Sequence, residues 1–319
     1  MKNVKRFLIL CLVSLLFISS PSVSMAGDSN YPSQIVTMIV NYSAGGGTDL
    51  AARALADAAS KPLGQVVGVA NAPGGSGSVG IAELKNQKND GYTIGVATLA
   101  PLAIVPWQMD VPYTPDDFDY ICAFGQYGYG LVVNADSKYN SVDDLLKAAK
   151  AAGRMNFGAT GYPQPFAMDA LGAAAEVKFS YITYADTPAL ITDILGGFIE
   201  CALCDQASFI SYVKSGQMKL LASATDKRWD AAPDVPTLQE LGYDVALLSY
   251  MGLAIPAGVD ANVLKILRDA FAVAVEDPTY KDIVAKSNLV HTYLSGEDYK
   301  KLVYEKYGEY KELFSKSGK

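Results

Sequence analysis

Residues 40–50 read VNYSAGGGTDL and join two segments with different patterns. Residues 35–40 before the glycines form a short apolar run typical of a buried strand, and residues 50–61 after them have the pattern of a helix. A strand, a Gly-rich turn and a helix N-terminus often bind an anion, because backbone N–H groups and the helix dipole converge there. A phosphate-binding P-loop would add a lysine, which this turn lacks. The turn therefore indicates a carboxylate site, with a tight turn that binds nothing as the alternative.

Strand-like and helix-like segments alternate along the rest of the chain, which indicates an α/β fold. The expected strands are 35–40, 65–70, 92–98, 130–134, 155–159, 179–184, 199–204 and 220–224. The expected helices are 50–61, 77–86, 142–153, 166–175, 187–195, 206–214, 259–276, 278–287 and 296–315. Residues 101–120 have no clean period and are expected to be irregular, and 227–242 read as loop and helix.

The N-terminal residues follow the order of a secretory signal peptide. Basic residues at positions 2, 5 and 6 precede the apolar run Phe7–Ile18, which is short for a membrane span. Ser24-Met25-Ala26 has the small-x-small pattern of a cleavage site. We therefore expect an exported protein that is cleaved after Ala26, with a buried N-terminal helix as the alternative.

The chain is acidic, with 26 basic and 33 acidic residues. Three of the basic residues and none of the acidic ones precede Gly27, so the mature chain would have 23 against 33, a formal charge of −10. This balance argues against nucleic acid and anionic membranes as partners. An anionic ligand would need local attraction instead of a basic surface.

Three cysteines would remain after cleavage: Cys122, Cys201 and Cys204. The last two have the C-x-x-C spacing, but they lie in the apolar run FIECALC, whereas a redox pair belongs at a helix N-terminus. On a strand, positions i and i+3 face opposite sides. We therefore predict buried free thiols in preference to a redox or disulfide pair.

The sequence offers little for catalysis. His291 is the single histidine, it follows an apolar stretch, and no Gly-x-Ser-x-Gly elbow accompanies it. Residues 75–80, GSGSVG, match Gly-x-Gly-x-x-Gly, but NAP separates them from the preceding strand and no acidic residue follows at dinucleotide-binding distance. We expect no catalytic residues, no metal site and no cofactor.

Taken together and in order, several segments resemble the periplasmic solute receptors of tripartite tricarboxylate transporters, the Bug family. The resemblance extends over nearly the whole mature length, including the helical tail. The segments that carry it are YPSQIVTMIVNYSAGGGTDLAARALA (31–56), LGQVVGVANAPGGSGSVG (63–80), DGYT (90–93), YADTPALITDILGG (184–197), RWDAAPDVPTLQELGY (228–243) and LAIPAGV (253–259).

This resemblance implies a type II periplasmic-binding-protein fold, with two α/β domains around a ligand cleft. It places a signal peptide at 1–26, one domain at 27–126 and 226–319, and the other at 127–225. It also implies a monomeric, non-enzymatic receptor in the periplasm that captures a di- or tricarboxylate, or a similar organic acid. The receptor would deliver this ligand to integral-membrane permease subunits of a tripartite transporter.

Two loops would hold the ligand by analogy with the family: a first loop, Ser43–Asp49, and a second loop, Ala159–Gln164. The second loop departs from the family pattern, because two prolines remove N–H donors and Tyr162 adds a phenol that could stack on the ligand or plug the cleft. Cys204 takes the place of a family acidic residue, with Asp205 next to it. The expected ligand-binding residues are Tyr42, Ser43, Ala44, Gly45, Gly46, Gly47, Thr48, Asp49, Thr98, Ala159, Thr160, Gly161, Tyr162, Gln164, Tyr184, Thr187 and Asp205.

Some alternatives stay open at this stage. Asp49 could point away from an anion as a first-turn carboxylate, or it could meet a cationic group on the ligand. A ligand-sensing protein that feeds a signalling partner is the alternative function, and a secreted hydrolase is a further one.

Overall fold

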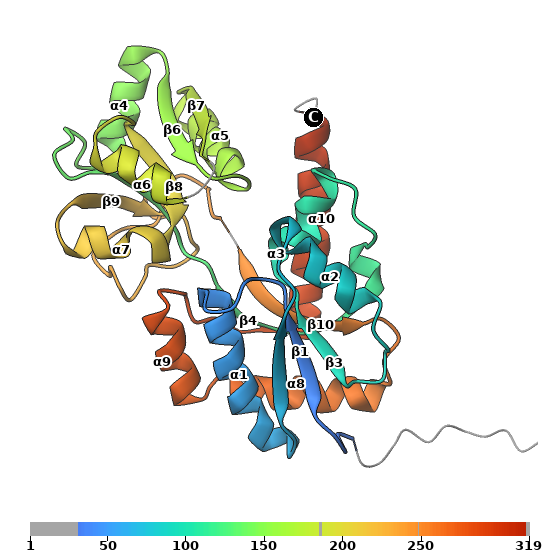
Figure 1. The fold of residues 1–319 in the computed structure, drawn as a ribbon. Helices are drawn as coiled ribbons and strands as arrows, with labels where there is room; N and C mark the ends of the chain where they lie inside the picture. Colours follow the sequence, from blue (N-terminus) through green and yellow to red (C-terminus); the bar gives the residue numbers. More distant parts are fainter. Residues whose placement is uncertain (1–30, 185–186, 248, 317–319) are drawn as a thin grey trace, which may run out of the picture. The chain divides into compact units, whose positions relative to one another are not determined.

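Two β-sheets organise the residues that the computed structural model describes, which are 31–184, 187–247 and 249–316 (Figure 1). The described residues from Pro32 onward belong to one unit. The expected signal peptide lies outside the described residues. Both sheets combine strands with flanking helices, which confirms the α/β fold class.

The first sheet has the strand order β11-β4-β10-β3-β1-β2. Strand β1 pairs in parallel with β2 and β3, whereas β10 runs antiparallel to both β3 and β4. Its strands are β1 (Val36–Val40), β2 (Val67–Asn71), β3 (Thr93–Val96), β4 (Phe118–Gln126), β10 (Tyr250–Pro256) and β11 (Leu294–Ser295).

Helices cover the first sheet in two groups. Helix α1 packs with α8 and α9, and α10 packs with α3 (Figure 1). These helices and α2 are α1 (Gly47–Leu63), α2 (Ser78–Lys85), α3 (Leu99–Ala103), α8 (Ala261–Ala274), α9 (Pro278–Lys286) and α10 (Gly296–Lys316).

The second sheet has the strand order β7-β6-β8-β5-β9. Its strands are β5 (Tyr129–Asn134), β6 (Met155–Ala159), β7 (Phe179–Thr183), β8 (Cys201–Asp205) and β9 (Met218–Ser223). Its helices are α4 (Val142–Ala152), α5 (Gln164–Ala175), α6 (Thr187–Leu195) and α7 (Gln206–Lys214). Helix α4 begins as expected at Ser141, whose hydroxyl accepts a hydrogen bond from the Asp144 N–H at 3.1 Å.

The chain passes twice between the sheets. Tyr127 and Gly128 connect β4 to β5, and residues 224–249 connect β9 back to β10. The two passages are hydrogen-bonded to each other, because the Tyr127 N–H donates to the Ser249 carbonyl at 2.9 Å. The first crossing contacts the first loop, because the Tyr127 phenol bonds to the Thr48 hydroxyl.

The structure corrects several sequence-based expectations. Residues 101–120 are not wholly irregular, because they contain the end of α3, two 3-10 turns and the start of β4. The predicted helix within 227–242 is wrong, since its residues form turns and isolated bridges. Strand β4 beyond residue 120 and the short β11 were not predicted at all.

Candidate functional site

The first loop forms the turn between β1 and α1. Gly45 has a left-handed backbone with φ of 82°, which favours glycine, and Gly46 is the extended N-cap of α1. No side chain caps this helix. The first N–H groups of an α-helix have no partner one turn earlier, so those of Gly47, Thr48 and Asp49 are suited to an external acceptor. The loop thus presents neutral donors and the positive end of a helix dipole.

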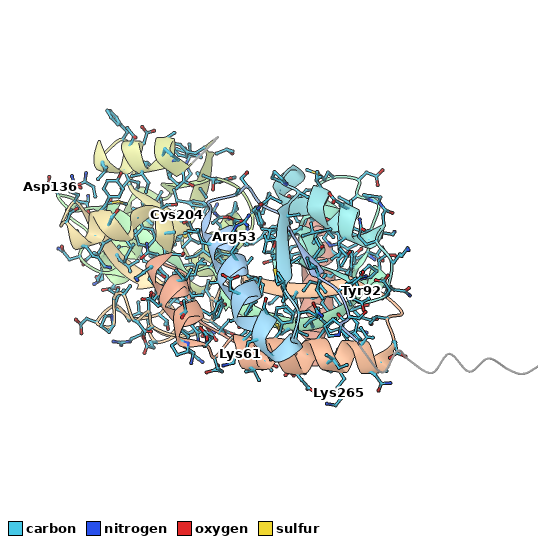
Figure 2. The ribbon with its side chains drawn as sticks, turned by 60° about the horizontal axis from the view of Figure 1, so that its bottom comes forward. Arg53, Lys61, Tyr92, Asp136, Cys204 and Lys265 are labelled. Carbon is cyan, nitrogen blue, oxygen red and sulfur yellow. The ribbon has the colours of Figure 1, made fainter. Side chains whose placement is uncertain are left out.

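Asp49 holds the first loop in place. Its carboxylate accepts hydrogen bonds from the Gly45 N–H at 2.9 Å, from Asn71 Nδ2 at 2.8 Å and from Arg53 Nε at 3.0 Å. Burial alone would raise the pKa of this carboxyl, but the hydrogen bonds from Arg53, Gly45 and Asn71 together lower its pKa. Figure 2 shows Arg53 on α1, with Lys61 further along the same helix.

This network bears on the two roles considered for Asp49. The side chain is 2% exposed, and groups of the chain itself occupy both of its oxygens. Direct contact with a cationic ligand would have to reach a carboxylate that is almost fully buried and already accepts three hydrogen bonds, so the geometry matches the first-turn carboxylate. The Gly45 N–H is likewise occupied, which removes one of the donors expected to face the ligand.

Hydroxyl groups around the first loop are linked in pairs. The Thr48 hydroxyl bonds to the phenol of Tyr127, which lies in the first crossing segment. The Tyr42 phenol bonds to the Thr98 hydroxyl at 3.2 Å, and the amide of Asn41 donates to the same hydroxyl at 3.3 Å. Burial raises the pKa of the Tyr42 phenol and, more strongly, that of Tyr127, so both remain protonated at neutral pH.

The second loop places its tyrosine against the C-terminal helix. The Tyr162 ring lies with its centroid 4.6 Å from that of Phe166 and 5.1 Å from that of Phe314 on α10. Phe166 also contacts Phe314 and Tyr310, at 5.1 and 5.6 Å. In this structure Tyr162 is therefore part of an aromatic contact between α5 and α10. Ala159 ends β6, and Thr160 and Gly161 precede this contact.

Gln164 stands at the first position of α5. Its side chain is 6% exposed, and among the described groups its Oε1 atom has no hydrogen-bond partner. A buried amide oxygen without a hydrogen-bond donor raises the free energy of the folded protein, and a bound water or ligand often supplies the donor. Its placement at the second loop is compatible with the predicted distal role.

The other distal candidates are tied to their own elements. The Tyr184 phenol donates to Asp193 at 2.8 Å, and Asp205 caps α7 by accepting from the Ser208 N–H at 3.1 Å. Thr187 begins α6 and lines a small hollow of about 260 Å³ between α6 and α7. These side chains therefore make contacts at helices α6 and α7, and their predicted ligand contacts stay a prediction.

A cleft of about 540 Å³ lies between the segment after β9 and helix α9 with the residues that follow it. Most of the residues that line this cleft were not predicted from the sequence as site residues. The lining residues are Gln206, Lys227, Arg228, Trp229, Asp230, Ala231, Lys281, Asp282, Val284, Ala285, Leu289, Val290 and His291. His291 Nε2 is 2.9 Å from the Val275 carbonyl oxygen, which anchors the ring to the end of α8.

Three residues that support the first loop were not predicted from the sequence. Asn71 and Arg53 bind Asp49, and Tyr127 binds Thr48. Asn71 lies in the segment VANAPGG, which follows a predicted strand and could have indicated it. Tyr127 lies in QYGYG after a strand that was not predicted, so no sequence signal pointed to it.

Cys122, Cys201 and Cys204 are free and buried, as predicted. Burial raises the pKa of the Cys201 and Cys204 thiols, which keeps them protonated and poorly reactive. Within the described part of the chain, no cluster of three or more His, Cys, Asp or Glu residues could hold a metal ion. In the same part, no helix is both long and apolar enough to cross a membrane.

Comparisons with known proteins agree on one family. The profile of the tripartite tricarboxylate transporter family receptor matches residues 51–318. A protein encoded in the gbd 5' region of Cupriavidus necator is 32% identical, over 92% of this chain and 91% of its own. BugT of Bordetella pertussis is 27% identical, over 81% of this chain and 82% of its own.

A solved structure extends the agreement to three dimensions. The crystal structure of a TctC solute-binding protein from Polaromonas superposes with a TM-score of 0.81 at 31% identity. The match covers 90% of this chain and 100% of that one. The family consists of periplasmic solute-binding receptors, not enzymes, which confirms the expected non-enzymatic role and excludes the hydrolase alternative. The chain belongs to the receptor family of the tripartite tricarboxylate transporters, in which the Bug proteins are found.

Proposed function

We propose that this receptor captures a small carboxylate, a di- or tricarboxylate or a similar organic acid, and delivers it to integral-membrane permease subunits. The observation that carries the proposal is the first loop. It presents the N-terminal N–H groups of α1 around glycines, and Asp49, Arg53 and Asn71 hold it in shape. A carboxylate near a helix N-terminus gains about 0.3–2 kcal/mol.

The charge of the loop sets the ligand class. The donors of the first loop are neutral, and the cationic Arg53 on α1 is paired with Asp49. A phosphate would benefit from an unpaired lysine, whereas a carboxylate needs only a few N–H and hydroxyl donors. The hydroxyls of Ser43 and Thr160 and the N–H groups of Gly47 and Thr48 are the proposed anchors for the first carboxylate.

The first test is a search for the ligand itself. Mass spectrometry of material released from the purified mature protein should detect an organic acid. In a thermal-shift screen, a carboxylate at 100 times its Kd should stabilise the fold by about 2.7 kcal/mol. Stabilisation by sugars, amines or metal ions in place of acids would refute the carboxylate assignment.

Gly46→Val should abolish carboxylate binding without unfolding the protein. Gly46 has φ of −76° and ψ of 165°, which valine adopts readily, so the change fills the loop without backbone strain. Isothermal titration of the stabilising acid measures the loss. Gly308→Val is the control, because a Cβ atom added at this position of α10 meets no atom within 4 Å. Unchanged affinity in Gly46→Val would show that the ligand binds elsewhere.

The export and domain assignments belong to the same proposal. We propose cleavage after Ala26, a monomer in the periplasm, and domain boundaries near 126 and 225. The mass of the mature protein tests the cleavage site, and light scattering tests the monomer.

A further inference from the structure

Tyr127 reaches the first loop from the segment that joins the two sheets. It lies between β4 and β5, and its phenol bonds to the hydroxyl of Thr48. Thr48 is the second residue of α1, and only 5% of it is exposed. A residue of the first crossing is therefore bonded to a residue whose N–H is a proposed anchor for the ligand carboxylate.

The backbone around Tyr127 is fixed on both sides. Its N–H donates to the Ser249 carbonyl of the second crossing at 2.9 Å, and the next carbonyl, that of Gly128, accepts from the Gln206 N–H at 2.7 Å. The space beside Gly128 is filled as well, since a Cβ atom added there would lie 2.9 Å from the Trp229 ring. The phenol is thus attached to a backbone that has little freedom to shift.

The bond to Tyr127 removes an alternative that the Thr48 hydroxyl would otherwise have. A threonine hydroxyl can bond to nearby backbone groups of its own segment, and such bonds compete with the helix. Among the described residues, Tyr127 is the one hydrogen-bond partner of this hydroxyl. Burial raises the pKa of the Tyr127 phenol, so the phenol retains its proton at neutral pH. The Thr48 side chain is therefore directed away from the backbone of its own loop.

The start of α1 needs such support. Gly46 is its N-cap and offers no side-chain cap, so the first turn is not fixed from within the helix. Asp49 ties this turn to Gly45, and the phenol of Tyr127 ties the preceding residue to the first crossing. Fixing a binding loop in its bound conformation strengthens binding, because the ligand does not have to order it.

We propose that Tyr127 is a positioning residue for ligand capture. Through its bond to the Thr48 hydroxyl, the phenol fixes the first turn of α1 in the orientation in which the N–H groups of Gly47 and Thr48 bind the carboxylate. Tyr127 acts through Thr48 and does not contact the ligand. This assignment rests on the proposed carboxylate-binding function and adds the residue by which the first crossing contributes to affinity.

Isothermal titration of the mature protein tests this role with succinate, citrate and benzoate, of which the tightest binder becomes the probe. Tyr127→Phe removes only the phenol oxygen and should weaken binding of the probe about three- to tenfold, the value of one hydrogen bond. Tyr120→Phe is the control, since it also removes one buried phenol hydrogen bond, to the Pro115 carbonyl at 3.1 Å. Its affinity should equal that of the wild type.

A double-mutant cycle separates positioning from a general loss of structure. Thr48→Val keeps the side-chain shape and the backbone N–H but removes the hydroxyl, so it should weaken binding by a similar factor. Thr48→Ser keeps the hydroxyl and should lose less affinity. In the Thr48→Val background, Tyr127→Phe should cause no further loss. In the protein without ligand, the amides of residues 44–50 should exchange hydrogen faster in Tyr127→Phe than in Tyr120→Phe.

The outcomes separate the positioning role from the function. Unchanged affinity in Tyr127→Phe, an equal loss in Tyr120→Phe, or a loss in the double variant equal to the product of the single losses would overturn the role and leave carboxylate capture intact. If Tyr127→Phe does not fold, the Thr48 variants decide, because equal losses in Thr48→Ser and Thr48→Val would overturn the role. Failure of all three acids to bind the wild type would refute the proposed function and the role with it.

Discussion

Asp49 shows how one residue can support a binding loop without contacting what the loop binds. A carboxylate directly in the first turn looks unfavourable for an anion site. The structure resolves this, because Arg53 neutralises the charge and Gly45 and Asn71 donate to the same group. The carboxylate of Asp49 thus fixes the shape of the loop, and the positive end of the α1 dipole stays available for a ligand.

Replacing Asp49 should destabilise the protein in a pH-dependent way. Asp49→Asn is expected to lower the free energy of unfolding at pH 7 by about 1–3 kcal/mol, because buried donors lose a charged acceptor. The folded-state pKa of Asp49 is below its ordinary value of 3.8, so its stabilisation is complete above that pH and disappears as the pH falls through the folded-state pKa. Urea unfolding at pH 7 and pH 3 measures both effects.

Asp57→Asn is the matched control for this experiment, since Asp57 lies on the same helix but is exposed. The difference in unfolding free energy between the two variants should be largest at pH 7 and smaller at pH 3. A constant gap between them across this range would show that the Asp49 charge does not stabilise the loop.

At the scale of elements, the sequence predicted those whose periodicity is clear and missed those buried on both faces. Helix α6 and strand β6 match their predicted bounds, and α4 has the predicted N-cap. Strand β4 is buried along nearly its whole length, so FDYICAFGQ shows no alternation of polar and apolar residues. The helix expected within 227–242 does not form, because the prolines and aspartates of this stretch favour turns.

The candidate site divides along the same line. The position of the first loop follows from the strand, the glycines and the helix around it. The residues that support the loop do not follow from this local pattern. Asn71 binds Asp49 from 22 residues further along the chain, and Tyr127 binds Thr48 from 79 residues further along. Contacts at such separations leave no local pattern in a single sequence.

The aromatic contact between α5 and α10 should stabilise both elements. Phe314 is 4% exposed, so Phe314→Ala is expected to cost about 3 kcal/mol of unfolding free energy and to weaken carboxylate binding by freeing Tyr162. Urea unfolding and isothermal titration measure the two effects. Tyr304→Ala, at an exposed position of the same helix, should cost much less. Equal losses would mean that the contact adds no stability.

At the scale of the whole molecule, the acidic charge opposes an anionic ligand. The far field of a chain with 33 acidic and 26 basic residues repels a carboxylate, whereas the loop N–H groups attract it only at contact distance. Added salt screens the far field more than the contact, since the Debye length falls to about 8 Å at 0.15 M.

Carboxylate affinity should therefore rise several-fold between 10 mM and 150 mM salt, because the Debye length shortens over this range and the repulsion by the distant acidic residues is screened. Isothermal titration at the two salt concentrations measures it. Asp136→Asn, at the surface position labelled in Figure 2, removes one charge and should change affinity only slightly. A fall in affinity with salt would show that an unpaired cation near the ligand dominates.

The two tryptophans lie in different surroundings, so the fluorescence of one of them can be measured separately after the other is replaced. Trp107 packs on Tyr307 of α10 with 4.6 Å between ring centroids, whereas Trp229 lines the cleft of about 540 Å³. Trp107→Phe would leave Trp229 as the one tryptophan, and its emission wavelength depends on the water beside the indole. Intrinsic fluorescence of this variant would then report, without an added label, on any change in the surroundings of that cleft.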